Sequence, residues 1–231
     1  MSLQREPVSR RERPAKPALT RDGIVGTAVG IMRSEGLEKL TMRRLAKELD
    51  TGPASLYVYV ANTAELHAAV LDALLGEVGP SAEESGGDWR VRLVAVLRSY
   101  TRVLLAHPQL ARSALVARPS GPNYLALAER LLGLLAQGGA SAEQTAWGLD
   151  LLLQYATATA AEHATQEQDP ASEENWKALD RAVHTVDAAT HPSIAAHRSA
   201  LLSGPAESRL TWGFDALING ILHTPVPRSE G

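Results

Sequence analysis

Apolar residues recur every three or four positions along most of this chain of 231 residues, a spacing that predicts amphipathic helices. The sequence contains neither the alternation that is typical of strands nor internal repeats, so it predicts an all-α fold. Residues 20–78 contain four short helices in succession. Beyond them the spacing predicts helices at about 88–106, 108–116, 124–137, 141–165, 172–190, 193–202 and 205–223.

A tight turn separates the second and third of the four short helices. Thr41 can cap the second helix, which stops where Asp50-Thr51-Gly52 supplies turn residues. Pro53 suits the first position of the next helix, expected over 53–60, because its missing N–H would be unpaired there in any case. This outline is typical of a helix-turn-helix, which places its second helix in the major groove of DNA.

Two runs in this region resemble a known protein family. The N-terminal DNA-binding domain of TetR-family transcriptional repressors is similar to Leu40-Thr41-Met42-Arg43-Arg44-Leu45-Ala46 and to the pattern Leu56-Tyr57, Tyr59-Val60, Asn62 and Glu65-Leu66. Membership implies an all-helical homodimer in which each chain has a three-helix DNA-binding head and a larger helical core. It also implies that the core binds a small molecule, and that this binding releases the DNA operator.

The resemblance implies which residues contact DNA. The matching positions are Thr41, Arg43, Arg44, Pro53, Ala54, Ser55, Tyr57, Tyr59 and Thr63. The first three would meet phosphates, the next three would approach base edges, and the two tyrosines would reach the backbone. The chain departs from the family at Asp50, where Gly is usual, at Gly52, where Ser or Thr is common, and at Thr63, which replaces a usual Lys. Because residues 53–60 contain no Arg or Lys, reading of guanine by a bidentate arginine is not expected.

The expected organisation has four parts. A flexible basic arm at 1–19 precedes a helix-turn-helix domain at 20–66, a helical effector-binding and dimerisation domain at 67–223, and a flexible tail at 224–231. Residues 1–21 carry a net charge of +4 and three prolines that prevent a continuous helix. Such an arm can follow phosphates or enter a minor groove, although it is alternatively a solubilising tail.

Two of the later helices have the composition of an interface. Helix 141–165 is apolar on nearly all sides, and a helix of this kind is buried on more than one face. The last helix has apolar residues at helical spacing, and Gly213 and Gly220 would permit close approach. In the family, the counterparts of these helices pair with their symmetry mates in a four-helix dimer interface. An ordinary intramolecular core is the alternative.

An effector pocket is expected between helices 88–106, 122–137 and 141–165. The candidate lining residues are Tyr100, Leu104, His107, Tyr124, Leu127, Trp147, Leu151, Gln154, Tyr155 and Ala158. Ligand cavities are mostly apolar with a few placed polar groups, and this set has that mixture, so a lipophilic effector is expected. Each residue taken alone fits plain core packing better than ligand contact.

Composition excludes several classes of protein. The chain contains no cysteine, which rules out disulfides and thiolate chemistry. It has no apolar run long enough to cross a bilayer and no signal-peptide core, so a cytoplasmic protein without a membrane partner is expected. The signatures of serine hydrolases, zinc proteases and nucleotide-binding loops are missing, and no enzymatic activity, cofactor or metal is predicted. His184, Asp187 and His191 share a helix face, but their segment is interpreted as solvated surface.

These features predict a ligand-responsive transcriptional regulator, by family default a repressor. Its partners would be a palindromic double-stranded operator, a small apolar effector and a second copy of the chain. A helical small-molecule-binding or scaffold protein with weak or lost DNA binding is the alternative, motivated by the uncharged third helix. An all-helical enzyme is the remaining possibility.

Overall fold

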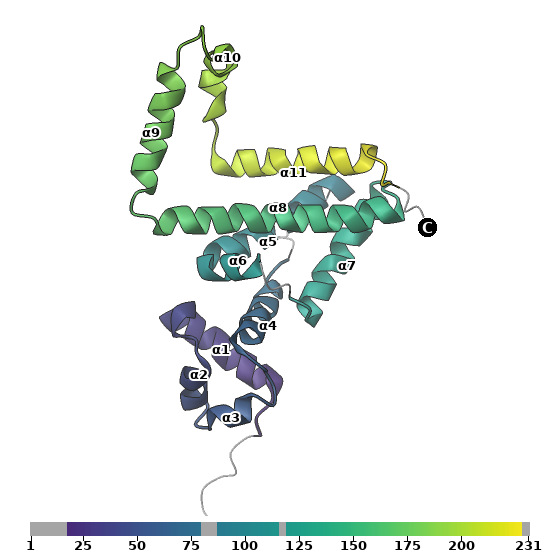
Figure 1. Ribbon diagram of the computed structural model, residues 1–231. Coiled ribbons are helices and arrows are strands. Elements are labelled where there is room, and N and C mark those ends of the chain that lie inside the picture. The colour runs from purple at the N-terminus through teal and green to yellow at the C-terminus, as the bar shows by residue number, and fades with distance from the viewer. Residues whose placement is uncertain (1–17, 80–86, 116–118, 228–231) are drawn as a thin grey trace, which may run out of the picture.

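The computed structural model describes residues 18–79, 87–115 and 119–227, and every element within these ranges is helical, as the sequence predicts. Figure 1 shows a small head, formed by α1 to α4, attached to a larger body in which α8 and α11 lie alongside each other. The head contains α1 (Arg21–Glu35), η2 (Leu37–Lys39), α2 (Met42–Glu48), α3 (Pro53–Leu56) and α4 (Thr63–Leu75). The body contains α5 (Trp89–Ala106), α6 (Pro108–Ala114), α7 (Pro122–Gln137), α8 (Ala142–Gln168), α9 (Ser172–Thr185), α10 (Pro192–Leu201) and α11 (Ala206–His223).

The predicted starts of α1, α2 and α4 are confirmed by their caps. The side chains of Thr20, Thr41 and Asn62 each accept a hydrogen bond from the backbone N–H three residues on, at 2.9 to 3.1 Å. These bonds satisfy one of the amides that a helix start leaves unpaired. Gly36 ends α1 with a φ of 89°, and Asp50 adopts a φ of 47° in the turn after α2.

The third helix is shorter than predicted, because α3 ends at Leu56 rather than at residue 60. Tyr57 still has helical angles, and the N–H groups of Tyr59 and Val60 both donate to the Leu56 carbonyl, at 2.9 and 3.0 Å. The backbone therefore turns tightly instead of continuing the helix. The turn is needed because Asn62, which caps α4, is extended with a φ of −162°.

Helix ends in the body also differ by a few residues from the sequence prediction. α8 continues to Gln168, and α9 stops at Thr185 rather than near residue 190. The side chain of Asp187 accepts a hydrogen bond from the Ala189 N–H at 2.9 Å. Such a side-chain bond gives the backbone an alternative to the helix, which accounts for the early end of α9.

Two hydrophobic clusters form the cores of the head and the body, and α4 belongs to both. Its Val70 and Leu74 are buried in the head cluster, whereas Leu71 and Leu75 are buried in the body cluster. Leu110 of α6 is also buried in the head cluster. The expected domain boundary at residues 66 and 67 thus falls within α4, a helix that contributes to both cores.

The helices α9 and α10 contain no buried residue, and Figure 1 shows them extending away from the ends of α8 and α11. Within the described residues these two helices pack mainly against each other. The cores that position the candidate sites are therefore built by α1 to α8 and α11.

Candidate functional site

The residues predicted to contact DNA lie on α2, on α3, in the loops next to these helices and at the first residue of α4. This part of the head is the one furthest from α8 and α11 (Figure 1). Seven of the nine are exposed, and only Arg44 and Tyr59 are partly buried. The structure thus gathers the predicted residues on one outward surface, although DNA contact by each of them stays a prediction.

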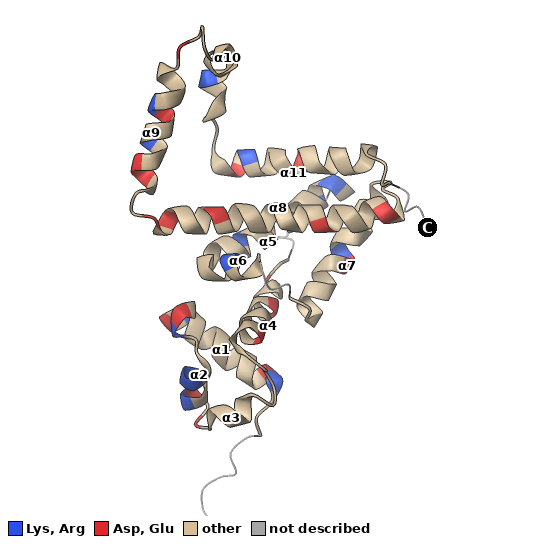
Figure 2. Cartoon of the chain, viewed as in Figure 1, with Lys and Arg blue, Asp and Glu red and all other residues tan. Residues whose placement is uncertain are grey.

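The two arginines of α2 differ in their surroundings. Arg44 donates to Glu35 at 2.5 Å and to Glu48 at 2.7 Å. These hydrogen bonds raise the pKa of Arg44, and the bond from Arg44 lowers the pKa of Glu35. Arg43 is exposed and makes no ion pair within the described residues, so Arg43 is better placed than Arg44 to meet a phosphate (Figure 2).

The two tyrosines after α3 also differ. The Tyr57 side chain is 53% exposed. The Tyr59 hydroxyl donates to the Leu19 carbonyl at 2.9 Å and so joins the turn after α3 to the start of α1. Tyr59 therefore has a structural role inside the head, and Tyr57 is the tyrosine whose side chain projects from it.

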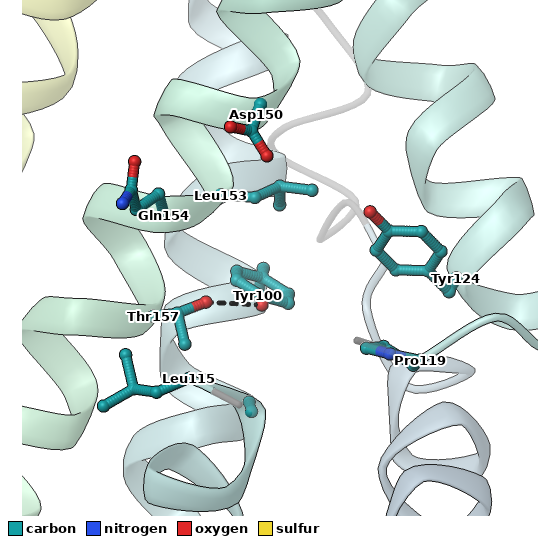
Figure 3. Close-up of a pocket in the computed structure, with 9 residues that line it drawn as sticks. Tyr100, Leu115, Pro119, Tyr124, Asp150, Leu153, Gln154 and Thr157 are labelled. Carbon is teal, nitrogen blue, oxygen red and sulfur yellow. Dashed lines mark hydrogen bonds between the residues drawn. The ribbon is translucent and has the colours of Figure 1, made fainter. Parts of the chain in front are cut away.

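A cavity of about 120 Å³ lies in the body between α5, α7 and α8. Its lining contains three predicted residues, Tyr100, Tyr124 and Gln154. The sequence analysis missed the remaining lining residues, which are Ala114, Leu115, Pro119, Asp150, Leu153 and Thr157 (Figure 3). This volume is smaller than the roughly 300 to 1,000 Å³ of typical ligand sites, so a drug-sized ligand would have to widen the cavity or extend through its mouth.

Polar groups make up much of this cavity wall. The hydroxyls of Tyr100 and Thr157 are hydrogen-bonded at 2.8 Å, and burial raises the pKa of Tyr100. Figure 3 shows Tyr124 of α7 across the cavity from Asp150 and Gln154 of α8. The wall can therefore hydrogen-bond a ligand from two sides, while Leu153 and Leu115 supply apolar contacts.

Four of the other predicted ligand residues are packed within the protein. Leu104 and Leu127 are buried in the body cluster. Tyr155 makes an edge-to-face contact with Phe214 of α11, with ring centroids 5.3 Å apart. His107 lines a separate cleft between head and body, and burial lowers its pKa.

The remaining three, Trp147, Leu151 and Ala158, are exposed on α8 outside the cavity. Trp147 and Leu151 line a groove between α8 and α11. Trp147 is 60% exposed, and Trp212 of α11 is 73% exposed. Trp212 lines a second groove, beside Tyr155 and Arg209. Large exposed apolar side chains of this kind mark interaction surfaces. Part of the apolar surface of α8, including Trp147 and Leu151, is therefore exposed to solvent in the single chain.

The two glycines of α11 meet different surroundings. A Cβ added to Gly213 would lie 2.1 Å from the Tyr155 hydroxyl, so Gly213 permits the close approach of α8 and α11 within one chain. A Cβ added to Gly220 would meet nothing within 4 Å, and this residue is exposed. Only Gly220 is therefore open to a helix from outside the chain.

A buried carboxylate joins the head to the cavity. Asp72 of α4 accepts a hydrogen bond from the backbone N–H of Tyr124 at 2.8 Å, and the Asn123 side chain donates to it at 3.4 Å. The residue at the start of α7, Gly121, supplies no side-chain cap, and a Cβ there would lie 2.2 Å from Asp72 Oδ2. Asp72 thus caps α7 from a different helix. It was missed in the sequence, where its only signal is an acidic residue within an apolar stretch of α4.

The described residues contain no cluster of three or more His, Asp or Glu side chains that could hold a metal ion. In the same residues we find no helix with the length and apolar character needed to cross a membrane.

A profile of known proteins matches most of the body of this chain. The profile described as the tetracyclin repressor-like C-terminal domain matches residues 80–224. Among curated relatives, a transcriptional regulator of Saccharopolyspora erythraea is 40% identical over 124 residues, which are 54% of this chain and 52% of that regulator. The repressor DrrR1 of Streptomyces coeruleorubidus is 29% identical over 92% of this chain and 80% of its own length.

Solved structures are similar over nearly the whole chain. The Streptomyces protein SCO7704, described as a transcription regulator, is 64% identical with a TM-score of 0.76, and the match covers 92% of this chain and 99% of that one. ActR of Streptomyces coelicolor in complex with actinorhodin is 37% identical with a TM-score of 0.76, over 89% of this chain and 96% of ActR. ActR has also been solved with (S)-DNPA.

Proposed function

Because the chain belongs to the TetR family of transcriptional regulators, we propose that it is a dimeric repressor whose operator is released when a small molecule enters the body. The observation that carries this proposal is the hydrogen bond between Asp72 and Tyr124, which we call the Asp72 joint. One carboxylate on α4, a helix shared with the head, binds the backbone of Tyr124, a residue of the cavity wall. A ligand that displaces Tyr124 therefore pulls on the helix that positions the DNA-facing surface.

The dimer is proposed to form through the exposed apolar face of α8 and α11. Trp147, Trp212 and Gly220 are all exposed there, so a second copy would bury large apolar side chains and could approach closely at the glycine. A twofold dimer presents two heads, which suits an operator with two half-sites about one helical turn apart. The acidic body and the basic N-terminal arm would direct the heads, rather than the body, toward DNA.

The effector is proposed to combine apolar surface with at least two hydrogen-bonding groups. The hydroxyls, amide and carboxylate of the cavity wall support this proposal, which narrows the expectation of a lipophilic molecule. ActR, which binds actinorhodin and (S)-DNPA, is similar in sequence and fold. Those two compounds are therefore the first probes to test.

The proposed activity is regulation rather than catalysis, and the protein would act in the cytoplasm, where bacterial operators lie. A gel-shift with duplexes selected by the protein from a random library tests this function directly. Failure to enrich any sequence, at low and at moderate salt, would favour instead a helical ligand-binding or scaffold protein without DNA affinity.

Replacing Arg43 with alanine is expected to reduce the salt dependence of DNA binding. If one phosphate per protomer is lost, the slope of log affinity against log salt falls by about 2 for the dimer. The measurement is a series of gel-shift constants at four salt concentrations. Arg181→Ala on α9, an arginine that pairs with Glu174 far from the head, is the control and should leave the slope unchanged. An unchanged slope for Arg43→Ala would remove Arg43 from the interface.

Replacing Gln154 with leucine is expected to weaken effector binding. Leucine is similar in size to glutamine, but it removes a hydrogen-bonding group from the cavity wall. One neutral hydrogen bond corresponds to roughly a 2- to 12-fold loss of affinity. The probe is whichever compound, in a panel that includes actinorhodin and (S)-DNPA, raises the melting temperature most. Gln166→Leu, on α8 outside the cavity, is the matched control. Equal affinities for both variants and the parent would place the effector elsewhere.

A further inference from the structure

We propose that this chain chooses its operator partly by reading the 5-methyl groups of thymine with an apolar surface formed by Pro53, Ala54, Tyr57 and Val58. We call these four residues the apolar reading surface. The inference rests on the proposed DNA-binding function and adds the chemistry by which a base sequence is recognised.

The apolar reading surface is formed by α3 and the turn that follows it. Pro53 and Tyr57 are four residues apart, a spacing that places side chains above one another on a helix, and all four residues are exposed. Tyr57 keeps helical angles after the end of α3. On the opposite side, Leu56 is fully buried in the head cluster. The four residues therefore face outward together, while Leu56 fixes the turn against the head.

The apolar reading surface is more exposed than apolar side chains usually are. Val58 is 81% exposed, which is the largest exposed fraction among the large apolar side chains of the described residues, and Tyr57 is 53% exposed. Residues 53–60 contain no charged side chain. Arg43 and Lys47 are both exposed on α2, a helix that contacts α3 and whose Lys and Arg positions are blue in Figure 2, so α2 can supply the charge that phosphates require. Positioning by phosphates and reading of bases are thus divided between α2 and the apolar turn.

Thymine is the base whose groove edge matches such a surface. In the major groove the bases present hydrogen-bond donors and acceptors, and the thymine 5-methyl is the apolar group among them. A valine set against a guanine or cytosine edge would desolvate polar groups without replacing their hydrogen bonds. Against thymine, the valine methyls and the base methyl are removed from water together. The hydroxyls of Ser55 and Tyr57 remain as the hydrogen-bonding groups of this turn.

The test uses a duplex that the full-length protein selects from a random library, in which each thymine is then replaced singly by deoxyuridine. Deoxyuridine keeps every hydrogen-bonding group and lacks only the 5-methyl. At one or two thymines in each half-site the replacement should weaken binding by about fourfold, as expected for one buried methyl group. At one of these positions Val58→Ala should abolish the deoxyuridine effect, while binding to unrelated DNA changes by less than twofold.

A matched control separates this effect from a general loss of fold. Val91→Ala on α5, where the valine is 53% exposed, should retain the full deoxyuridine effect at every position. Tolerance of deoxyuridine throughout the selected duplex would overturn the proposal, and so would an undiminished effect in Val58→Ala. Neither outcome affects the proposed function, which fails only if no sequence is enriched.

Discussion

Replacing Trp147 with glutamate is expected to separate the dimer into single protomers and to weaken operator binding by at least about 100-fold. The indole is 60% exposed in the single chain, in the groove between α8 and α11, so a second copy would bury it. Burying a carboxylate in an apolar interface without a partner costs several kcal/mol. A single protomer would also contact one half-site instead of two. Analytical ultracentrifugation and gel-shifts measure the two effects.

The control for this substitution is Leu125→Glu on α7. Leu125 is also 60% exposed, but it lies outside the α8 and α11 groove. This variant should remain a dimer with the operator affinity of the parent. If Trp147→Glu is still a dimer at micromolar concentration, the exposed face of α8 is not the interface.

Replacing Asp72 with alanine is expected to leave operator binding nearly intact and to abolish release by the effector. The substitution removes the acceptor of the Tyr124 N–H, so movement of the cavity wall would no longer be transmitted to α4. The free energy of unfolding should fall by about 1 to 2 kcal/mol, because a helix cap is lost. Gel-shifts with and without effector, together with urea unfolding, test both parts.

The matched control is Asp88→Ala. The Asp88 side chain caps α5 by accepting a hydrogen bond from the Val91 N–H at 3.0 Å, so both partners of this bond belong to the body. Asp88→Ala should lower the free energy of unfolding by about 1 kcal/mol, as the loss of a helix cap generally does, and should preserve the effector response. An effector response retained in Asp72→Ala, or lost equally in Asp88→Ala, would show that coupling does not pass through the Asp72 joint.

The head was predictable from sequence because its boundaries have local causes. Thr20, Thr41 and Asn62 cap helices with their own side chains, and each bond spans three residues. Pro53 starts α3 as expected. The predicted end of α3 at residue 60 was wrong. The chain turns after Leu56 and leads to Asn62, which caps the next helix.

The cavity could be predicted only in part, because α8 is apolar on most sides. The predicted stripe of Trp147, Leu151 and Ala158 has regular helical spacing, yet in the fold it is exposed outside the cavity. The stripe that lines the cavity passes through Asp150 and Thr157 instead. The two stripes meet at the level of Gln154. Periodicity in one helix gives the existence of apolar faces and does not say which neighbour covers each.

The sequence by itself determined the helical class, most helix boundaries and the family to which the chain belongs. These depend on spacing, capping and motifs within a few residues of each other. Only the tertiary structure decided which face of α8 meets the cavity, that Arg44 is engaged by Glu35 and Glu48, and that Asp72 caps α7. The bond between Asp72 and Tyr124 joins residues 52 positions apart. The free energy that selects such a contact comes from the packing of whole helices, which no local pattern encodes.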